Sequence, residues 1–320
     1  MKNKNGVMSV NAIIEKITEQ IQEGIYPGAS LALYRNGQWS EHYLGLADPE
    51  KEEPVVADLV YDLASVSKVV GVATICAFLY AKGELELDRP FKELYPRFAH
   101  EKTTIRELLT HTSGLDPFIP NRDQLDARQL KTALENLQLK EDKSFHYTDV
   151  NFLLLGFWLE DRFHQPLDRL FDELIFAPWK MTETRFGPVK KAVPTVRGVA
   201  SGSVHDPKAR VLGCHAGSAG LFSTVADLER FLEHYLKEDF ARDLSQNFAR
   251  EEGKTRALGW NLEGDWLDHT GYTGTFIMYN RKSQEAVIFL SNRTYEKDER
   301  AQWILDRNSL MDLIKQEFEK

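Results

Sequence analysis

Strand patterns occur at both ends of this 320-residue chain, with a helical stretch between them. After Gly28 the segment ASLALYRNGQWSEHYLGLA alternates around Asn36-Gly37, a dipeptide typical of two-residue hairpins. Beyond Thr255 strand patterns return in RALGWNL, WLDHTG, TFIMYN and EAVIFLSN. Helical periodicity dominates from about residue 65 to residue 174. We therefore expect one antiparallel sheet built from both chain ends, with a helical block inserted between its two parts.

Amphipathic helices are predicted outside both sets of strands. Apolar residues recur at helical spacing near each terminus, at Ile13, Ile17 and Ile21 and again at Trp303, Leu310, Ile314 and Phe318. The predicted fold class is α/β of the α+β type, an antiparallel sheet flanked by terminal helices. Residues 1–62 and 193–320 are expected to form this discontinuous α/β subdomain, and residues 63–192 the inserted all-helical subdomain.

Composition and charge exclude several classes of partner. The formal net charge is −9, whereas nucleic acids and anionic membrane surfaces need a basic face. No secretory signal or lipobox is visible, and the apolar stretches 69–81 and 152–159 are shorter than the ~20 residues that span a bilayer. Of the two cysteines, Cys76 lies inside a helical pattern, so no disulfide framework is predicted. We expect a cytoplasmic protein that binds neither nucleic acid nor a membrane; the oligomeric state is not predicted.

A serine and a lysine lie one helical turn apart in YDLASVSKVVGVATI, residues 61–75. Residues i and i+3 of a helix face the same way, so Ser65 and Lys68 can come within hydrogen-bonding reach. Burial among the neighbouring valines disfavours the ammonium form, and Lys68 could then act as a base for Ser65. A helix start also directs backbone N–H groups toward a developing oxyanion. Alone the pattern is weak, because a chain of this length contains roughly one S-x-x-K by chance.

Two further motifs follow in order. FHYTDVNF, residues 145–152, contains Tyr147 and Asn151, and DHTGYTGT, residues 268–275, ends a predicted strand. The order S-x-x-K, Y-x-(N or D), (K or H)-T-G resembles the serine β-lactamase and penicillin-binding-protein superfamily, in its class C β-lactamase-like branch of esterases and D-alanyl-D-alanine peptidases. LLTHTSGL (108–115) and GSVHDPKARVLGCHAGSAGLFSTVADLERF (202–231) add to the likeness, which spans about residues 28–292.

The resemblance implies a role for each matching residue. Ser65 would be the acylated nucleophile, Lys68 its proton acceptor, and Tyr147 a proton relay that also helps to activate the deacylating water. The N–H groups of Ser65 and Tyr272 would form the oxyanion hole. The remaining motif residues would bind substrate: Asp149, Asn151, His269, Thr270 and Gly271. The active site would lie at the junction of the two subdomains, and no metal or cofactor is implied.

Two positions depart from the pattern of the superfamily. Asp149 stands where β-lactamases usually have Asn, and its carboxylate is expected to raise the affinity of Lys68 for its proton. His269 stands where Lys is usual, which removes a fixed positive charge for a substrate carboxylate. Both changes favour neutral esters or amides over penicillins.

Other nucleophiles and ligands are weaker predictions. AGSAGLF approximates the G-x-S-x-G elbow of α/β-hydrolases, with Ser218 as nucleophile and Asp265 or Asp268 and His269 following in order. A capping box beginning at Thr224 indicates instead that Ser218 lies in a loop. His111 has no histidine or carboxylate partner at the spacing of metal ligands. Cys214 and His215 are adjacent in sequence, but neighbouring side chains rarely face each other, so a catalytic thiol dyad is not predicted.

The sequence predicts a serine hydrolase that cleaves an ester or amide of a small molecule or short peptide through a Ser65 acyl-enzyme. The alternatives are a penicillin-binding, sensor-like protein that is acylated without turnover, and an α/β-hydrolase-type esterase that uses Ser218. The natural substrate is not predicted, because the loops that would set specificity have no derivable shape.

Overall fold

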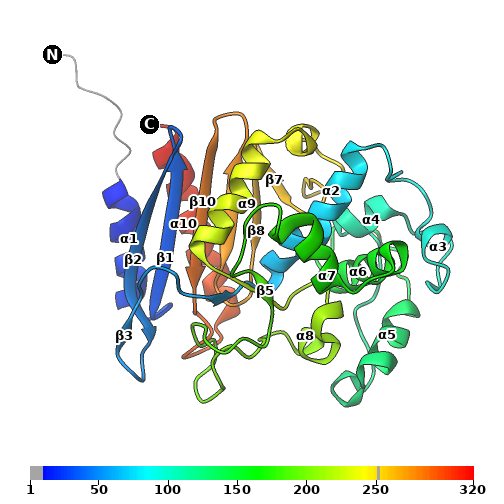
Figure 1. Ribbon diagram of the computed structural model, residues 1–320, viewed down its shortest axis with the longest axis horizontal. Helices are drawn as coiled ribbons and strands as arrows, with labels where there is room; N and C mark the ends of the chain where they lie inside the picture. The colour runs from blue at the N-terminus through cyan, green and yellow to red at the C-terminus, as the bar shows by residue number, and fades with distance from the viewer. Residues whose placement is uncertain (1–9, 251–252) are drawn as a thin grey trace.

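Strands from both ends of the chain form one antiparallel sheet in the computed structural model, which describes residues 10–250 and 253–320 (Figure 1). Within the described residues seven strands follow the order β3-β2-β1-β10-β9-β8-β7. Their bounds are β1 Gly28–Arg35, β2 Gln38–Asp48, β3 Glu53–Pro54, β7 Asn261–Glu263, β8 Trp266–Thr270, β9 Phe276–Asn280 and β10 Glu285–Ser291. β1 pairs with β10, with Leu31 opposite Phe289, so the two ends meet at the centre of the sheet. The predicted fold class is confirmed.

Helices cover both faces of the sheet. α1 (Val10–Gln22) and α10 (Arg300–Phe318) pack on one face, and α9 (Val225–Lys237) packs on the other (Figure 1). Successive side chains of a strand point to opposite faces. In β1, Leu31 therefore joins the core under α1 and α10, while Ala32 joins the larger core on the α9 side. This double burial explains why the predicted strand reads as a nearly continuous apolar run.

A helical block lies beside the β7 end of the sheet (Figure 1). Its helices are α2 Thr74–Ala81, α3 Phe91–Leu94, α4 Ile105–Thr110, α5 Ala127–Glu135, α6 Val150–Phe163, α7 Leu167–Phe171 and α8 Pro207–Leu212. A small antiparallel sheet joins β4 (Tyr61–Asp62), β6 (Leu221–Ser223) and β5 (Arg185–Phe186) in the order β4-β6-β5. The subdomain boundaries at residues 63 and 192 stay predictions.

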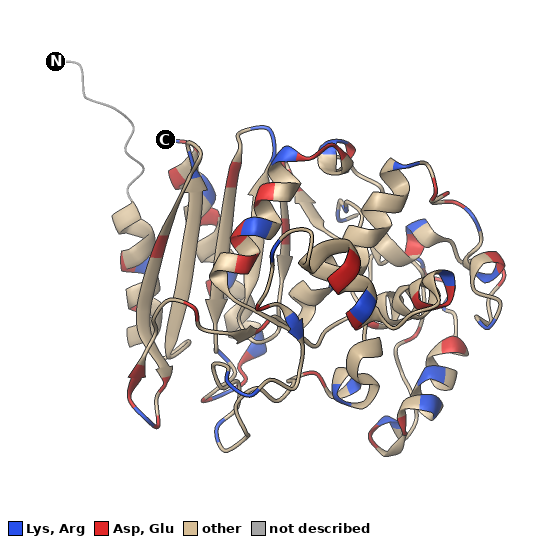
Figure 2. Ribbon diagram, in the orientation of Figure 1, with Lys and Arg blue, Asp and Glu red and all other residues tan. Residues whose placement is uncertain are grey.

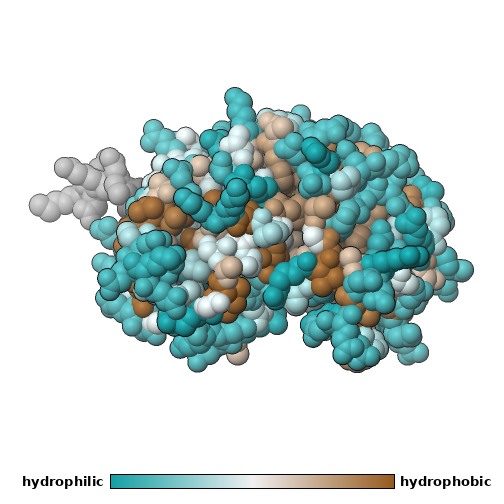
Figure 3. All heavy atoms as spheres, turned by 60° about the horizontal axis from the view of Figure 1, so that its bottom comes forward, coloured by the Kyte–Doolittle hydropathy of each residue, from teal (hydrophilic) through white to brown (hydrophobic). Residues whose placement is uncertain are grey.

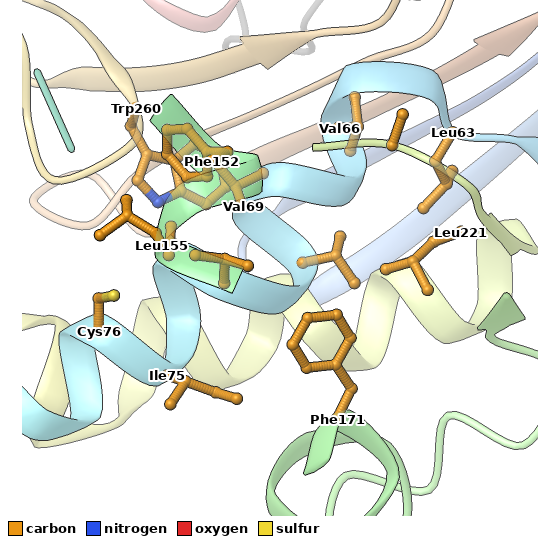
Figure 4. Packing of buried hydrophobic residues seen from close by; sticks show 14 of the residues in the cluster. Leu63, Val66, Val69, Ile75, Cys76, Phe152, Leu155, Phe171, Leu221 and Trp260 are labelled. Atoms are coloured by element: carbon orange, nitrogen blue, oxygen red, sulfur yellow. The ribbon is translucent and has the colours of Figure 1, made fainter. Parts of the chain in front are cut away.

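The helix that follows Ser65 runs through the core of the helical block. A 3-10 turn (Ala64–Val66) leads through a π-helical segment (Val69–Ala73) into α2. By length and apolar content Ala64–Ala81 would suffice to cross a membrane, but 78% of this stretch is buried inside the protein. Figure 4 shows Val66 and Val69 among Phe152 of α6, Phe171 of α7 and other apolar side chains. The predicted buried helix is confirmed.

Charged side chains are spread over the surface. Basic and acidic residues alternate along the outer helices in Figure 2, including α9. In Figure 3 the molecule is turned so that the lower side of Figure 1 faces the viewer, and apolar residues form small patches between hydrophilic ones. The visible faces therefore carry mixed charge, and a basic stripe of the kind that binds nucleic acid is not seen on them.

Candidate active site

Ser65 lies on a strained turn between β4 and the core helix. Ala64, which precedes it, has φ +46°, in the left-handed region that non-glycine residues rarely adopt. Asp62 stabilises this turn, because its Oδ1 accepts the Ala64 N–H at 2.8 Å and its Oδ2 accepts the His205 N–H at 2.8 Å. Within residues 61–70, Ser65 alone is not buried. The turn therefore presents this hydroxyl at the surface, and backbone strain of this kind is typical of functional positions.

Lys68 lies directly behind the serine. Its side chain is fully buried, and Nζ donates to Ser65 Oγ at 2.8 Å. Nζ also donates to Asp149 Oδ1 at 2.7 Å and to the Ser218 carbonyl at 2.9 Å. All three ammonium protons thus have an acceptor, as a buried lysine requires. The predicted approach of Ser65 and Lys68 is present in the structure.

The pKa of Lys68 differs from the sequence-based expectation that burial would favour its neutral form. Burial by itself lowers the pKa of Lys68, as expected from the valines around it. The negative charge of Asp149 outweighs that effect and raises the Lys68 pKa above its usual value. The expectation that burial leaves Lys68 readily neutral is therefore wrong, whereas the expectation that Asp149 raises its proton affinity agrees with the structure.

Asp149 is held between two lysines. Lys68 Nζ lies 2.7 Å from Oδ1, and Lys208 Nζ lies 3.1 Å from Oδ2. Burial tends to raise the pKa of this carboxyl, but the two ammonium groups hold it well below its usual range. Asp149 is therefore ionised at neutral pH, and it lines the cleft as a negative charge.

Tyr147 stands at the cleft wall in front of Lys68. Its side chain is 37% exposed, and the ring centroid lies 5.2 Å from Lys68 Nζ. The ring also packs 4.6 Å from the His111 ring and 6.1 Å from the His269 ring, measured between centroids. Its hydroxyl is thus placed near both Lys68 and the opening of the cleft.

Asn151 does not line the cleft, in contrast to its predicted substrate-binding role. It is fully buried, and its Oδ1 accepts from Ser113 Oγ at 2.8 Å. Its amide nitrogen lies 3.3 Å from His111 Nδ1, which also accepts the Thr148 N–H at 3.4 Å. In the first turn of α6 the side chain points inward, so Asn151 supports the segment carrying Tyr147 and Asp149. His111 itself is buried and takes part in the contacts of this segment.

His269 forms the opposite wall, near the end of β8. The imidazole is 2% exposed, and neither ring nitrogen has a hydrogen-bond partner within residues 10–250 and 253–320. Burial, together with the charges of Lys68 and Arg256, lowers the pKa of His269 well below its ordinary value. The imidazole is therefore neutral at physiological pH, with one donor and one acceptor nitrogen, and it lines the cleft.

Gly271 lets the end of β8 approach the serine turn. A Cβ atom at this position would lie 2.6 Å from the Leu63 carbonyl oxygen, so a larger residue would push strand and turn apart. Thr273 and Thr275 fasten the same two segments, since their hydroxyls donate to the carbonyls of Asp62 at 2.8 Å and Leu63 at 3.0 Å. This close contact places Thr270, Gly271 and Tyr272 beside Ser65, as predicted.

The backbone N–H groups of Ser65 and Tyr272 donate to no acceptor in the described part of the chain. The Tyr272 side chain packs between two neighbours. The centre of its ring lies 4.7 Å from the Arg293 guanidinium and 5.4 Å from the centre of the His205 ring. Its carbonyl accepts from Arg293 Nε at 2.8 Å. A rigid loop with a free N–H beside a serine N–H is the arrangement that an oxyanion requires.

These residues meet in one cleft of about 830 Å³. Predicted site residues that line it are Ser65, Tyr147, Asp149, His269, Thr270, Gly271 and Tyr272. Sequence reasoning missed three contributors: Lys208, Asp62 and Arg307, whose Nη1 donates to Thr270 Oγ1 at 3.1 Å. Lys208 lies in the quoted HDPKAR segment, but nothing in that segment indicates its distant partner.

The rival arrangements are not assembled. Ser218 Oγ is fully buried and has no partner among the described residues, Asp265 pairs with Lys282, and Asp268 accepts from Asn261. His215 pairs with Glu160 and not with a thiol. Over residues 10–250 and 253–320, no group of three or more His, Cys, Asp or Glu side chains could hold a metal ion.

Comparisons with known proteins agree with the fold and give its family. A family model described as Beta-lactamase matches residues 13–310. A putative D-alanyl-D-alanine carboxypeptidase of Escherichia coli (strain K12) is 26% identical, over 90% of this chain and 83% of that protein. Two solved structures share the fold at 20% identity. A hydrolase with promiscuous acyltransferase activity, EstCE1, has a TM-score of 0.76 over 95% of this chain and 97% of its own. A class C β-lactamase from Rhodobacter sphaeroides has a TM-score of 0.70 over 95% and 99%.

Proposed function

This chain belongs to the beta-lactamase family. We propose that it is a serine hydrolase that cleaves an ester or amide of a small molecule or short peptide through a Ser65 acyl-enzyme. The observation that carries the proposal is the 2.8 Å hydrogen bond between Lys68 Nζ and Ser65 Oγ at the base of the cleft. A nucleophile in contact with a potential base, beside two free N–H groups, is the set of groups that acyl transfer needs.

The proposed reaction begins with attack of Ser65 Oγ on the substrate carbonyl. The hydroxyl proton passes to the amine form of Lys68, and the carbonyl oxygen becomes an oxyanion held by the N–H groups of Ser65 and Tyr272. Tyr147 then relays a proton to the leaving group, and the acyl-enzyme forms as the carbonyl bond to that group breaks. Water, activated on the Tyr147 side, releases the acid and restores Ser65.

Neutral acyl donors are the proposed substrates. The neutral His269 offers one donor and one acceptor, which suits an amide or ester group better than a carboxylate. Arg307 does bring a positive charge to Thr270, but its guanidinium already donates to Thr270 Oγ1 and Asn308 Oδ1. We therefore expect penicillins to acylate Ser65 poorly and short uncharged esters to be turned over.

Intact-protein mass spectrometry tests the proposal. The protein is incubated in parallel with a fluorophosphonate, a penicillin and a p-nitrophenyl ester, with Ser65→Ala as the control. Labelling by the fluorophosphonate at Ser65 together with turnover of the ester is the expected result. A stable adduct without turnover would favour a receptor that is acylated once, and a label on Ser218 would favour the α/β-hydrolase mechanism.

A further inference from the structure

We propose that Lys208 is a positioning residue that lowers the proton affinity of Lys68 by sharing the Asp149 carboxylate. The inference rests on the proposed function, because it concerns the general base of the same serine. A base must lose its own proton before it can accept one from Ser65. A cation that competes for Asp149 makes this loss easier.

The three charges form a short chain across the cleft. Lys68 binds one oxygen of Asp149 at 2.7 Å, and Lys208 binds the other at 3.1 Å. Only 13% of the Lys208 side chain and 24% of the Asp149 side chain are exposed. Solvent and salt therefore screen these interactions less than those of a surface pair.

Local sequence fixes Lys208 in this position. Asp206 caps α8 by accepting the Ala209 N–H at 2.8 Å, and Pro207 occupies the first helical position. Lys208 follows in the first turn, with Nζ 3.5 Å from Asp206 Oδ2. The same loop is bound to the serine turn, because Asp62 accepts the His205 N–H. Lys208 is thus held at a defined distance from the nucleophile.

The charge balance explains the effect. With Asp149 alone, the Lys68 ammonium would have a full counter-charge at 2.7 Å. Lys208 neutralises part of that carboxylate, which weakens its hold on the Lys68 ammonium and favours the amine. Other groups are present with or without Lys208: Tyr147, His111 and His269 around Lys68, and Lys254 and Arg256 beside these histidines.

The first test is the rate of Ser65 labelling by an uncharged fluorophosphonate between pH 6 and pH 9. Lys208→Met keeps the length of the side chain and removes its charge, and we expect it to slow labelling at pH 7 about tenfold, equivalent to about one pKa unit on Lys68. Lys208→Arg should restore most of the rate, and Lys190→Met should leave it unchanged, because Lys190 is an exposed residue outside the cleft. Lys208→Gln serves if the methionine variant does not fold. An unchanged rate in Lys208→Met, or no recovery in Lys208→Arg, overturns the proposal.

A double-mutant cycle tests whether the effect passes through Asp149. In an Asp149→Asn background, Lys208→Met should change the labelling rate less than twofold, whereas an equal loss in both backgrounds overturns the proposal. The same cycle is measured on the free energy of unfolding in urea, where the two substitutions should be non-additive. This second readout needs no activity. If the wild type is not labelled at all, the proposed function fails, and additivity in the unfolding cycle still decides against the coupling of Lys208 to Asp149.

Discussion

Lys68 and Asp149 form an ion pair of 2.7 Å beneath the nucleophile, although 81 residues separate them in the chain. The lysine is fully buried, and the carboxylate raises its pKa. A protonated lysine cannot accept a proton from Ser65, so in the proposed mechanism this pair would set the pH at which acylation becomes fast.

Asp149→Asn should shift the pH dependence of acylation to lower pH. The pKa of Lys68 in the folded protein lies above its value in the unfolded chain. Lys68 therefore stays an ammonium at neutral pH, and the amine appears only as the pH rises toward the folded pKa. Removing the carboxylate lowers the folded pKa, and the rising limb of the labelling rate should move down by about one pH unit or more. Asp161→Asn, at an exposed pair with Arg97, is the control. An unmoved limb would show that Asp149 does not govern the base.

Ser65→Ala should abolish both labelling and ester turnover while the fold persists. The hydroxyl makes no cap, and its one side-chain contact is with Lys68. Ser218→Ala should change the rate less than twofold, because its buried hydroxyl has no partner in the described part of the chain and Lys68 binds only its carbonyl. Peptide mapping of the fluorophosphonate adduct identifies the labelled serine.

Tyr147→Phe should reduce the rate of ester turnover on the order of a hundredfold or more, the usual effect of losing a general acid or base. Lys68→Ala should slow acylation severely for the same reason. The matched control is Tyr80→Phe, since the Tyr80 ring packs against Phe248 away from the cleft. Stopped-flow measurement separates acylation from deacylation. Near-normal rates in Tyr147→Phe would leave this residue a packing role only.

His269→Lys should shift preference toward substrates that carry a carboxylate. A charge-assisted hydrogen bond to a carboxylate contributes about 1.5–3 kcal/mol, about ten- to a hundredfold in kcat/KM. The measurement is the ratio of kcat/KM for a neutral ester and its carboxylated analogue. Arg307→Met is the control variant, and it should change this ratio of kcat/KM much less than His269→Lys does. A wild type that already hydrolyses penicillins efficiently would contradict the assignment.

Asp62 should make the protein more stable at pH 5 than at pH 7. Burial raises the pKa of Asp62 to about 6, above its unfolded value of about 3.9. Between these two pKa values the folded state binds a proton that the unfolded state lacks. The contribution of Asp62 to the free energy of unfolding therefore increases by about 1 kcal/mol as the pH falls from 7 to 5. Urea unfolding at both pH values checks it, and Asp62→Asn should lose this increment. Equal pH dependence in the two proteins would show that Asp62 does not titrate in this range.

The sequence alone determined the sheet and the outline of the site. Alternation around Asn36-Gly37 and the short apolar run in EAVIFLSN specify strands whose backbone groups must pair, and the terminal strands meet at β1 and β10. Ser65 and Lys68 meet because helical geometry brings i and i+3 together. Such features depend on neighbours within one or two turns, which a sequence displays directly.

Tertiary structure decided the electrostatics of the site. Lys208 reaches Asp149 across 59 residues, and His269 is buried beside Lys68 and Arg256 although it reads as an ordinary strand residue. Asn151 turns inward to Ser113, a contact that its motif does not indicate. The charge state of a side chain depends on burial and on the groups within a few ångströms. Long-range packing supplies both, so the protonation states of Lys68, Asp149 and His269 follow only from the folded chain.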